Sequence, residues 1–328
     1  MDRVTFALLN DFQRDFPLVP RPFRILGEHC GASEGEVLRI LRDLHAAGAV
    51  SRVGAVVARG RLGASTLSAL AVPPRSLDAV AAAISALPEV NHNYAREHHY
   101  NLWFVANAAN RAALDELLAR IEAMTGLRPL DLPLIAEYHI DLGFDLAGAG
   151  PDGIREASSA RPRVLEADEH LLLHALQDGI EIVPEPFRAL ASRLGLQQSR
   201  VLAMLDRCME DGIIRRFGVI VRHHELGFRE NAMAVWDVPD ALVDRCGSLA
   251  AGVHEVTLAY RRRRQLPDWP YNLFCMVHGK ERRHAEDAIQ RLIATARLEE
   301  FPHQLLFSTR RYKQCGARFR HVEAVAHG

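Results

Sequence analysis

The strongest constraint on the fold of this chain is that its 328 residues contain the same pattern twice. VPRPFR at 19–24 recurs as VPEPFR at 183–188, and GAVSRVGAVV at 48–57 recurs as GIIRRFGVIV at 212–221. Because the matches keep their order along the chain, the sequence predicts a tandem duplication. A chain of this length is long enough for two or more domains, each with its own core.

The first part of each half has the pattern of a winged helix-turn-helix. In the first half we expect a helix over 3–16, a short second helix, and a third helix in SEGEVLRILRDLHAAG at 33–48. Ser33 and Glu36 have the spacing of a capping box, and Gly48 is where a helix C-terminal glycine belongs. The stretch that follows, AVSRVGAVVARGRLG, is expected to form a hairpin or wing.

The second part of each half alternates strands and helices. In the first half, the order is strand TLSALAVP, helix 76–87, strand NLWFVANA, helix 111–124 and strand PLIAEYHI. Together with the wing strand, this order indicates a ferredoxin-like sandwich. The second half repeats it with a strand at 231–238, a helix at 240–250 and a strand at 272–278. The predicted fold class is α+β, a tandem duplication of a winged helix-turn-helix and a ferredoxin-like domain.

A linker between the halves completes the domain prediction. LAGAGPDGIREASSARPR is rich in Gly, Ala, Pro and Ser and has no apolar periodicity. The expected order is winged helix-turn-helix 1–60, α+β domain 61–145, linker 146–163, winged helix-turn-helix 164–224 and α+β domain 225–328.

A helix-turn-helix raises the hypothesis of a DNA-binding regulator with a small-molecule ligand, and its charge argues against DNA. The candidate recognition helix 33–47 has two arginines and three carboxylates, and so has its counterpart 197–211, a net charge of −1 each. The whole chain has a formal charge of −1 and a pI of about 7.0. Duplex affinity comes largely from Lys and Arg that neutralise phosphates. A regulator that binds through flanking residues remains the alternative.

The remaining composition indicates a cytoplasmic protein without a membrane partner. No apolar stretch approaches the length that spans a bilayer, and the first residues, MDRVTFALLNDFQRDF, are too charged for a secretory signal. The five cysteines are odd in number and contain no CxxC pair, which argues against a disulfide framework or a zinc site.

Basic and aromatic residues gather at one equivalent place in both halves. The first half has HNYAREHHYNLWF at 92–104, and the second has LAYRRRRQLPDWPYNLFCMVHG at 258–279. Both contain a tyrosine, an arginine two positions later, and YNL before an apolar strand. A solvated loop would explain one such run. Its recurrence in both halves favours a functional site.

These two motifs resemble the two subunit types of siroheme decarboxylase, an Lrp/AsnC-like enzyme of haem and haem d1 synthesis, here in a fused form. The likeness spans 3–140 and 168–310. It implies loss of CO₂ from the C12 and C18 acetate side chains of siroheme, giving 12,18-didecarboxysiroheme. It also implies a tetrapyrrole bound by the α/β region, two halves paired as a pseudo-dimer, and no cofactor beyond the iron of the substrate. A further homodimer is left open.

The expected catalytic residues are His92, Arg96 and His98. Arginine suits bidentate binding of a substrate carboxylate, and histidine suits protonation of the carbon that loses CO₂. If 92–98 is extended, alternate residues share one face, which would also hold Tyr94. His99 is expected at the surface. The structural alternative is that His92 and His98 form hydrogen bonds that cap a strand end.

A second set is expected to bind substrate: Tyr94, Tyr100, Arg261, Arg262, Arg263, Trp269, Tyr271 and His278. His278 is also a candidate axial ligand to the substrate iron. A structural role for His278, and an interface salt bridge for Arg96 and Arg262, stay open. The sequence does not decide which half holds the productive site.

Overall fold

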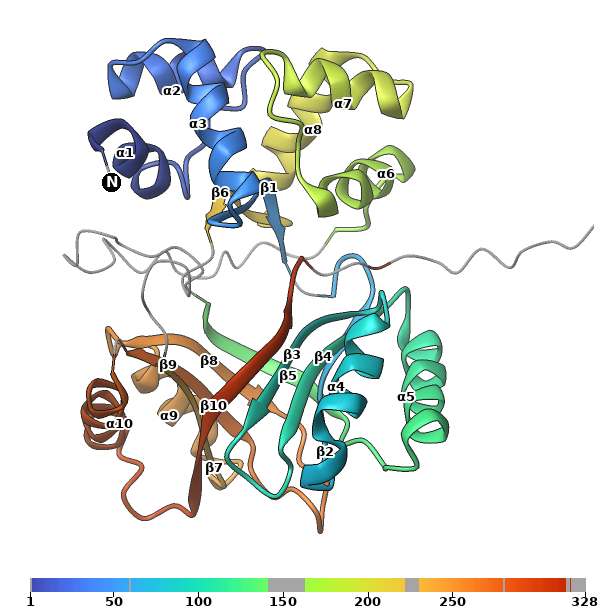
Figure 1. Cartoon of the computed structure of the whole chain (residues 1–328), viewed down its shortest axis with the longest axis vertical. Coiled ribbons are helices and arrows are strands. Elements are labelled where there is room, and N and C mark those ends of the chain that lie inside the picture. The colour runs from blue at the N-terminus through green and yellow to red at the C-terminus, as the bar shows by residue number, and fades with distance from the viewer. Residues whose placement is uncertain are drawn as a thin grey trace, which may run out of the picture. The chain divides into compact units, whose positions relative to one another are not determined.

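The computed structural model describes residues 2–58, 60–140, 163–221, 230–279, 281–316 and 319. The chain forms two compact units, of which unit 1 comprises Met1–Leu62 with Gly143–Leu226, and unit 2 comprises Gly63–Leu142 with Gly227–Gly328. Each unit therefore collects the corresponding parts of both halves (Figure 1). The linker predicted over 146–163 lies outside the described residues except for Arg163, and the predicted domain boundaries stay a prediction.

Unit 1 contains the two helix-turn-helix copies. The first copy is α1 (Arg3–Asn10), α2 (Pro22–Cys30), α3 (Glu34–Ala46) and β1 (Val50–Val57), and the second is α6 (Ala167–Ala175), the 3₁₀ turn η2 (Leu176–Asp178), α7 (Pro186–Leu194), α8 (Gln198–Glu210) and β6 (Ile214–Val221). The side chain of Ser33 accepts a hydrogen bond from the Glu36 N–H, and Gly48 has φ of 81°, as the sequence predicted. The first helix ends at Asn10 and not at 16.

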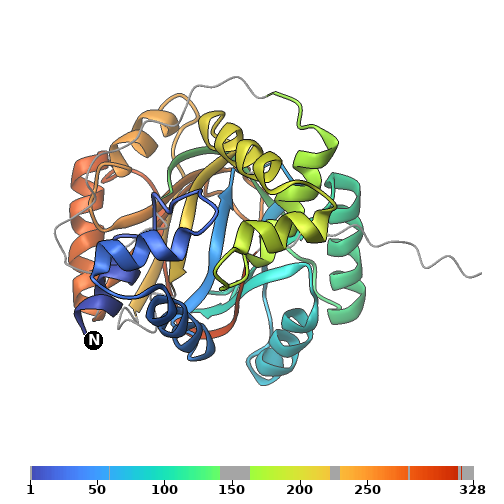
Figure 2. The ribbon, with the colours of Figure 1, turned by 90° about the horizontal axis from the view of Figure 1, so that it is seen from above.

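The expected wing differs from the structure. Among the described residues β1 forms no hairpin of its own and pairs with β6, its counterpart in the other copy, in an antiparallel ladder that sets Gly54 opposite Gly218. A Cβ atom on Gly218 would lie 2.2 Å from the carbonyl oxygen of Gln13, so only glycine fits there. Figure 2 shows the helices of the two copies on either side of these strands. A partner so distant in sequence leaves no local signal, which explains the error.

Unit 2 contains two β-α-β-β-α-β repeats. The first is β2 (Ala64–Leu70), the 3₁₀ turn η1 (Pro74–Ser76), α4 (Leu77–Ala86), β3 (Val90–Arg96), β4 (Leu102–Ala108), α5 (Arg111–Thr125) and β5 (Leu132–Ile140). The second is β7 (Glu230–Trp236), α9 (Val243–Ala250), β8 (Val256–Arg262), β9 (Leu273–Gly279), α10 (Arg282–Ala296) and β10 (His303–Gln314). The ferredoxin-like prediction is confirmed. The sequence, however, assigned the wing strand to each sheet. In the structure that strand is replaced by β3 in the first repeat and by β8 in the second.

The two sheets of unit 2 join into one closed barrel with strand order β10-β3-β4-β2-β5-β8-β9-β7. The last strand of each repeat makes the junction, since β5 pairs with β8 and β10 pairs with β3. The helices α4 and α5 cover the outside of one sheet, and α9 and α10 cover the other (Figure 1). No helix among the described residues is long and apolar enough to span a membrane.

Strand alternation divides the side chains of the barrel between two environments. On β9, Leu273, Cys275 and Val277 pack under the helices, whereas Phe274 and Met276 belong to an interior cluster. That interior cluster also holds two aromatic residues of the second repeat, Tyr260 and Trp269. On β3 and β9, therefore, only every second residue faces the inside of the barrel.

Candidate active site

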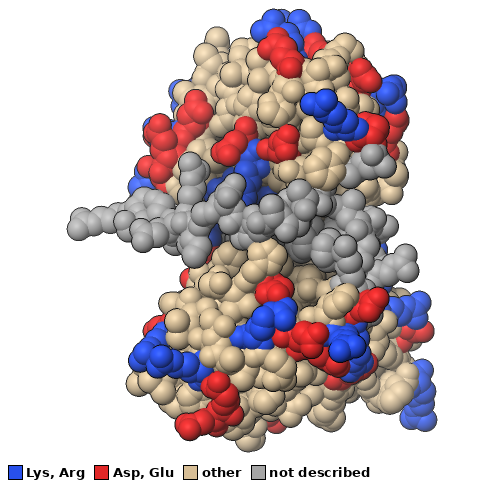
Figure 3. Space-filling model, turned by 90° about the vertical axis from the view of Figure 1, so that its left-hand side faces the viewer, with Lys and Arg blue, Asp and Glu red and all other residues tan. Residues whose placement is uncertain are grey.

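The arginines of the two candidate recognition helices are engaged within unit 1. Arg39 pairs with Asp43 at 3.2 Å, and Arg42 donates to the carbonyl oxygen of Ile182 at 3.0 and 2.7 Å. On α8, Arg200 pairs with Asp168 at 2.5 Å and Arg207 with Glu169 at 2.7 Å. On the face drawn in Figure 3, basic and acidic side chains are interspersed on each unit. Each of these four guanidinium groups is thus already paired with a carboxylate or with a carbonyl oxygen.

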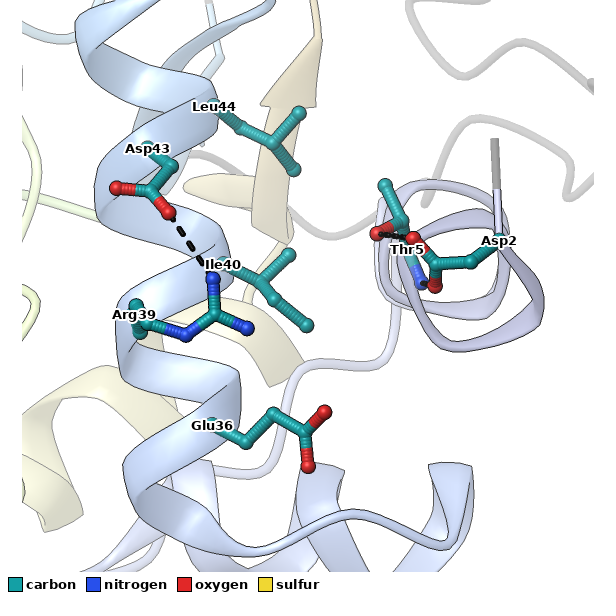
Figure 4. A pocket seen from close by; sticks show the side chains of 7 residues that line it. All are labelled: Asp2, Thr5, Glu36, Arg39, Ile40, Asp43 and Leu44. Carbon is teal, nitrogen blue, oxygen red and sulfur yellow. Dashed lines mark hydrogen bonds and ion pairs between the residues drawn. The ribbon is translucent and has the colours of Figure 1, made fainter.

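A pocket of about 220 Å³ lies between α1 and α3 (Figure 4). Its polar lining is mainly acidic, with the carboxylates of Asp2, Glu36 and Asp43 beside the single guanidinium of Arg39. Arg39 is itself paired with Asp43, as the dashed line in Figure 4 shows. A pocket with this charge is poorly suited to an anionic ligand, so the candidate site lies elsewhere.

Inside the barrel of unit 2, the first motif supplies a polar row on β3. The His92 and Tyr94 rings are stacked with centroids 6.4 Å apart, and the Tyr94 hydroxyl donates to Oε1 of Gln314 at 3.1 Å. Arg96 follows on the same face, with its guanidinium carbon 5.8 Å from the centroid of the Tyr94 ring. The predicted shared face of His92, Tyr94 and Arg96 is therefore present.

Arg96 is a buried cation. Only 8% of the residue is exposed. One terminal nitrogen donates to the carbonyl oxygen of Leu306 at 2.9 Å, and the other lies 3.9 Å from Sδ of Met276. In the described part of the chain it has no carboxylate partner, and burial lowers its pKa to about 10. The interface salt bridge considered for Arg96 is thus not formed among these residues. A buried guanidinium without a counterion favours binding of an anion.

His278 lies beside Arg96 on the interior face of β9. Burial, and then the positive charge of Arg96, lowers the pKa of His278 to about 4. The ring is therefore neutral near pH 7. A neutral imidazole can coordinate iron or accept a hydrogen bond, so this position fits the predicted axial ligand.

His98 belongs to a different cluster from His92. The strand ends at Arg96, and His98 lies in the bend that follows, where its Nδ1 accepts the N–H of Tyr100 at 3.0 Å. Its ring meets Trp269 edge-on at 5.5 Å, and Trp269 also contacts Tyr271 at 4.9 Å. Burial, and then the charge of His99, lowers the pKa of His98. The structure therefore separates the two predicted histidines, with Tyr100, Trp269 and Tyr271 grouped around His98.

The arginines of the second motif, which the sequence predicted to bind substrate together, do not lie on one face. Arg262 is 5% exposed, donates to the carbonyl oxygen of Leu132 at 2.8 Å and packs 5.2 Å from the Tyr260 ring centroid. Arg261 instead pairs with Asp240 and Asp244, at 3.2 and 3.4 Å, and the exposed Arg263 pairs with Asp131 at 2.8 Å. Strand alternation turns neighbouring arginines to opposite faces, and only Arg262 points inward.

Two polar residues of the site were missed from the sequence. Arg311 and Gln314 lie on β10, opposite Tyr94 and His92 in the ladder with β3. Directly opposite residues of antiparallel strands share a face, so both belong with the β3 row. The available signal was the match of the last strand of the two halves, PLIAEYHI with HQLLFSTRRYKQ, which the sequence prediction did not use.

The fold and site define a fused pair of AsnC-like α/β domains with a cationic, histidine-containing barrel interior. Residues 61–139 and 225–313 match the family model of the AsnC-like ligand binding domain. Residues 6–50 and 169–215 match the model of the siroheme decarboxylase NirDL-like HTH domain. The two models thus divide the chain as its two units do.

Known siroheme decarboxylase subunits are similar to this chain over one half or over its whole length. The chain is 44% identical over 327 residues to the siroheme decarboxylase NirDL subunit of Paracoccus denitrificans, covering 99% of both chains. The siroheme decarboxylase NirL and NirD subunits of Stutzerimonas stutzeri are 49% and 53% identical over 148 and 146 residues, which cover 45% and 44% of this chain and 87% and 96% of the subunits.

A solved siroheme decarboxylase NirDL in co-complex with an iron-uroporphyrin III analogue is also similar. It has a TM-score of 0.69 and 25% identity, covering 96% of this chain and 93% of that chain. The chain therefore belongs to the siroheme decarboxylase family and is an enzyme of the carboxy-lyase class. Its two halves form a pseudo-dimer within one polypeptide.

Proposed function

We propose that this chain removes CO₂ from the C12 and C18 acetate side chains of siroheme, giving 12,18-didecarboxysiroheme, inside the barrel of unit 2. The tetrapyrrole is the partner, and its own iron is the only metal required. Support for a tetrapyrrole substrate comes from the NirDL relatives and from the similar NirDL that was solved with an iron-uroporphyrin III analogue.

The buried Arg96 is the observation that carries the proposal. Holding a guanidinium away from water costs free energy, as the lowered pKa of about 10 indicates. No carboxylate offsets this cost within the described residues. A substrate acetate would supply the missing counterion through a charge-assisted, bidentate contact. Siroheme carries eight carboxylates, so such a contact is available to it.

Loss of CO₂ from an acetate leaves an electron pair on the methylene carbon, delocalised into the adjacent pyrrole. A proton must then reach that carbon to form the methyl group. We assign this delivery to His92, which shares the face of Arg96 and Tyr94. His98 is the weaker candidate because its Nδ1 already accepts the Tyr100 N–H and its pKa is lowered, both of which favour the neutral ring. His98 instead positions the aromatic cluster around Trp269.

His278 supplies a neutral imidazole for the iron of the substrate or for a substrate hydrogen bond. Its pKa of about 4 keeps the ring uncharged throughout the neutral range. The apolar neighbours of the site, Trp103 and Phe274 in the interior cluster, would favour departure of a desolvated carboxylate. The tetrapyrrole accepts the electron density, so no added nicotinamide, flavin or ATP is needed.

The direct test is anaerobic incubation of the purified chain with siroheme, followed by mass analysis of the tetrapyrrole. We expect two successive losses of CO₂ without any added cofactor. Folded protein that leaves the siroheme mass unchanged would overturn the proposal. Regiochemistry at C12 and C18 is checked by nuclear magnetic resonance of the demetallated product.

The regulator alternative finds no comparable support. The arginines of α3 and α8 are engaged with carboxylates or with a backbone carbonyl, and the pocket beside α3 is mainly acidic. Sequence-selective binding to duplex DNA at physiological salt, with no turnover of siroheme, would favour the regulator instead.

A further inference from the structure

The two junctions that close the barrel of unit 2 have the same register. Across β3 and β10, the Cα partners are His92–Gln314, Tyr94–Arg311, Ala95–Arg310 and Arg96–Ser308. Across β8 and β5, they are Leu258–Ile140, Tyr260–Glu137, Arg261–Ala136 and Arg262–Leu134. Both ladders have their irregularities at the same steps. Residues at the two junctions can therefore be compared position by position.

The positions that agree have a structural explanation. Each junction has an arginine that donates to a backbone carbonyl in the other repeat, Arg96 to Leu306 at 2.9 Å and Arg262 to Leu132 at 2.8 Å. Each arginine also lies against the tyrosine of its own strand. The duplicated Tyr and Arg therefore make the same contacts at both junctions and do not distinguish one junction from the other.

At other equivalent positions the two junctions have different side chains. We define the β3–β10 wall as His92, Tyr94, Arg96, Arg311 and Gln314, and the β5–β8 wall as Leu258, Tyr260, Arg262 and Glu137. The β3–β10 wall has an imidazole where the other has an apolar side chain. It also has the Arg311 guanidinium where the other has the Glu137 carboxylate.

Contacts show that Arg311 belongs to the site side of β10. It donates to Oε1 of Gln314 at 3.3 Å, and the same oxygen accepts the Tyr94 hydroxyl at 3.1 Å. Burial raises the pKa of Tyr94, and the positive charges of Arg96 and then Arg311 act against that increase. Arg96 and Arg311 therefore act on the same tyrosine from one face.

The exchange of charge has a direct consequence for a ligand with many carboxylates. On the β3–β10 wall, two guanidinium groups attract it. On the β5–β8 wall, the Glu137 carboxylate opposes the attraction of Arg262, and like charges in a partly buried site repel strongly. The two walls have the same backbone and differ in electrostatics.

We propose that each chain binds one tetrapyrrole, on the β3–β10 wall, and that Arg311 binds one of its carboxylates while Glu137 keeps a second tetrapyrrole off the β5–β8 wall. This inference rests on the proposed function, since it takes the tetrapyrrole as ligand. It goes further by naming the productive wall and the pair of residues that selects it.

The test is an absorbance titration of the full chain with iron-uroporphyrin III, comparing wild type with Arg311→Gln, Arg311→Lys, Glu137→Gln and Arg310→Gln. We expect one equivalent bound per wild-type chain. Arg311→Gln should weaken binding by roughly 10- to 100-fold, the value of one charge-assisted contact, and Arg311→Lys by less. Glu137→Gln should leave the affinity of the first equivalent within about twofold and allow a second, weaker equivalent to bind, because it removes the charge that repels the ligand from the β5–β8 wall. Arg310→Gln should change neither the affinity nor the number of equivalents, because Arg310 is exposed and pairs with Asp78.

Thermal melting of each variant separates a binding defect from a folding defect, and Arg311→Lys serves if the glutamine variant does not fold. Two equivalents bound per wild-type chain would overturn the inference, and so would a single equivalent bound by Glu137→Gln. So would unchanged affinity in Arg311→Gln, or weaker binding in Glu137→Gln. Turnover of siroheme by wild type is measured separately. If turnover is present and Arg311→Gln binds normally, the wall assignment fails and the proposed function stands; if turnover is absent, the proposed function fails.

Discussion

Replacing Arg96 by methionine should separate stability from function. The fall in the pKa of Arg96 from 12.5 to about 10 corresponds to about 3 kcal/mol of unfavourable free energy at neutral pH. The sign follows because the folded protein disfavours the charged form. The cost is complete below pH 10 and disappears as the pH rises through 10 toward 12.5. Methionine removes this cost and keeps most of the apolar contact.

The same change leaves the carbonyl oxygen of Leu306 without its donor, which costs about 1–3 kcal/mol. The two effects together leave the Arg96→Met variant between unchanged and about 2 kcal/mol more stable. For a unit of this size that is an increase in Tm of at most roughly 4–8 °C. Binding of iron-uroporphyrin III should fall by about 100-fold or more, since the carboxylate loses its buried partner.

Calorimetry of the ligand-free protein and a binding titration measure the two quantities. Arg310→Met is the matched control, because Arg310 is exposed on β10, and its removal should change neither Tm nor affinity appreciably. A fall of more than about 2 kcal/mol in the unfolding free energy of Arg96→Met would refute the reasoning. It would mean that the protein itself stabilises this charge and that no substrate carboxylate is needed.

Three further predictions concern the histidines and unit 1. His92→Gln should reduce turnover by about 10² to 10⁴-fold with iron-uroporphyrin III affinity retained, whereas His98→Gln should lose less than tenfold; the opposite order, in single-turnover assays, would exchange their roles. His278 has a folded pKa of about 4, below its unfolded value of 6.5, so wild type should lose up to about 3 kcal/mol of stability as the pH falls from 6.5 to 4. Urea titrations should show that His278→Gln lacks this loss, and an equal loss in the variant would contradict it. Replacing Arg39 and Arg42 together by alanine should leave turnover within about threefold. The same variant should lower the melting temperature of unit 1, because the contact of Arg42 with Ile182 is lost.

Local sequence patterns predicted most of the elements and the family. The Ser33 cap, the Gly48 helix end and the alternation of helices and strands depend on neighbours a few residues apart, and each appears in the structure. The repetition of these patterns predicted the duplication, and the two tyrosine–arginine motifs indicated the family. The charges of α3 and α8 also followed from composition alone.

Long-range strand pairing decided the rest. Whether GAVSRVGAVV folds back on itself or pairs with its copy depends on a partner more than a hundred residues away, and β1 pairs with β6. The burial of Arg96, the outward pairing of Arg261 and Arg263, and the separation of His98 from His92 all depend on where each strand ends and which face it turns inward. The same register sets Arg311 and Glu137 at equivalent junctions. Side-chain period along a strand is local, but the identity of the facing strand is not, because closing a barrel joins segments distant in sequence.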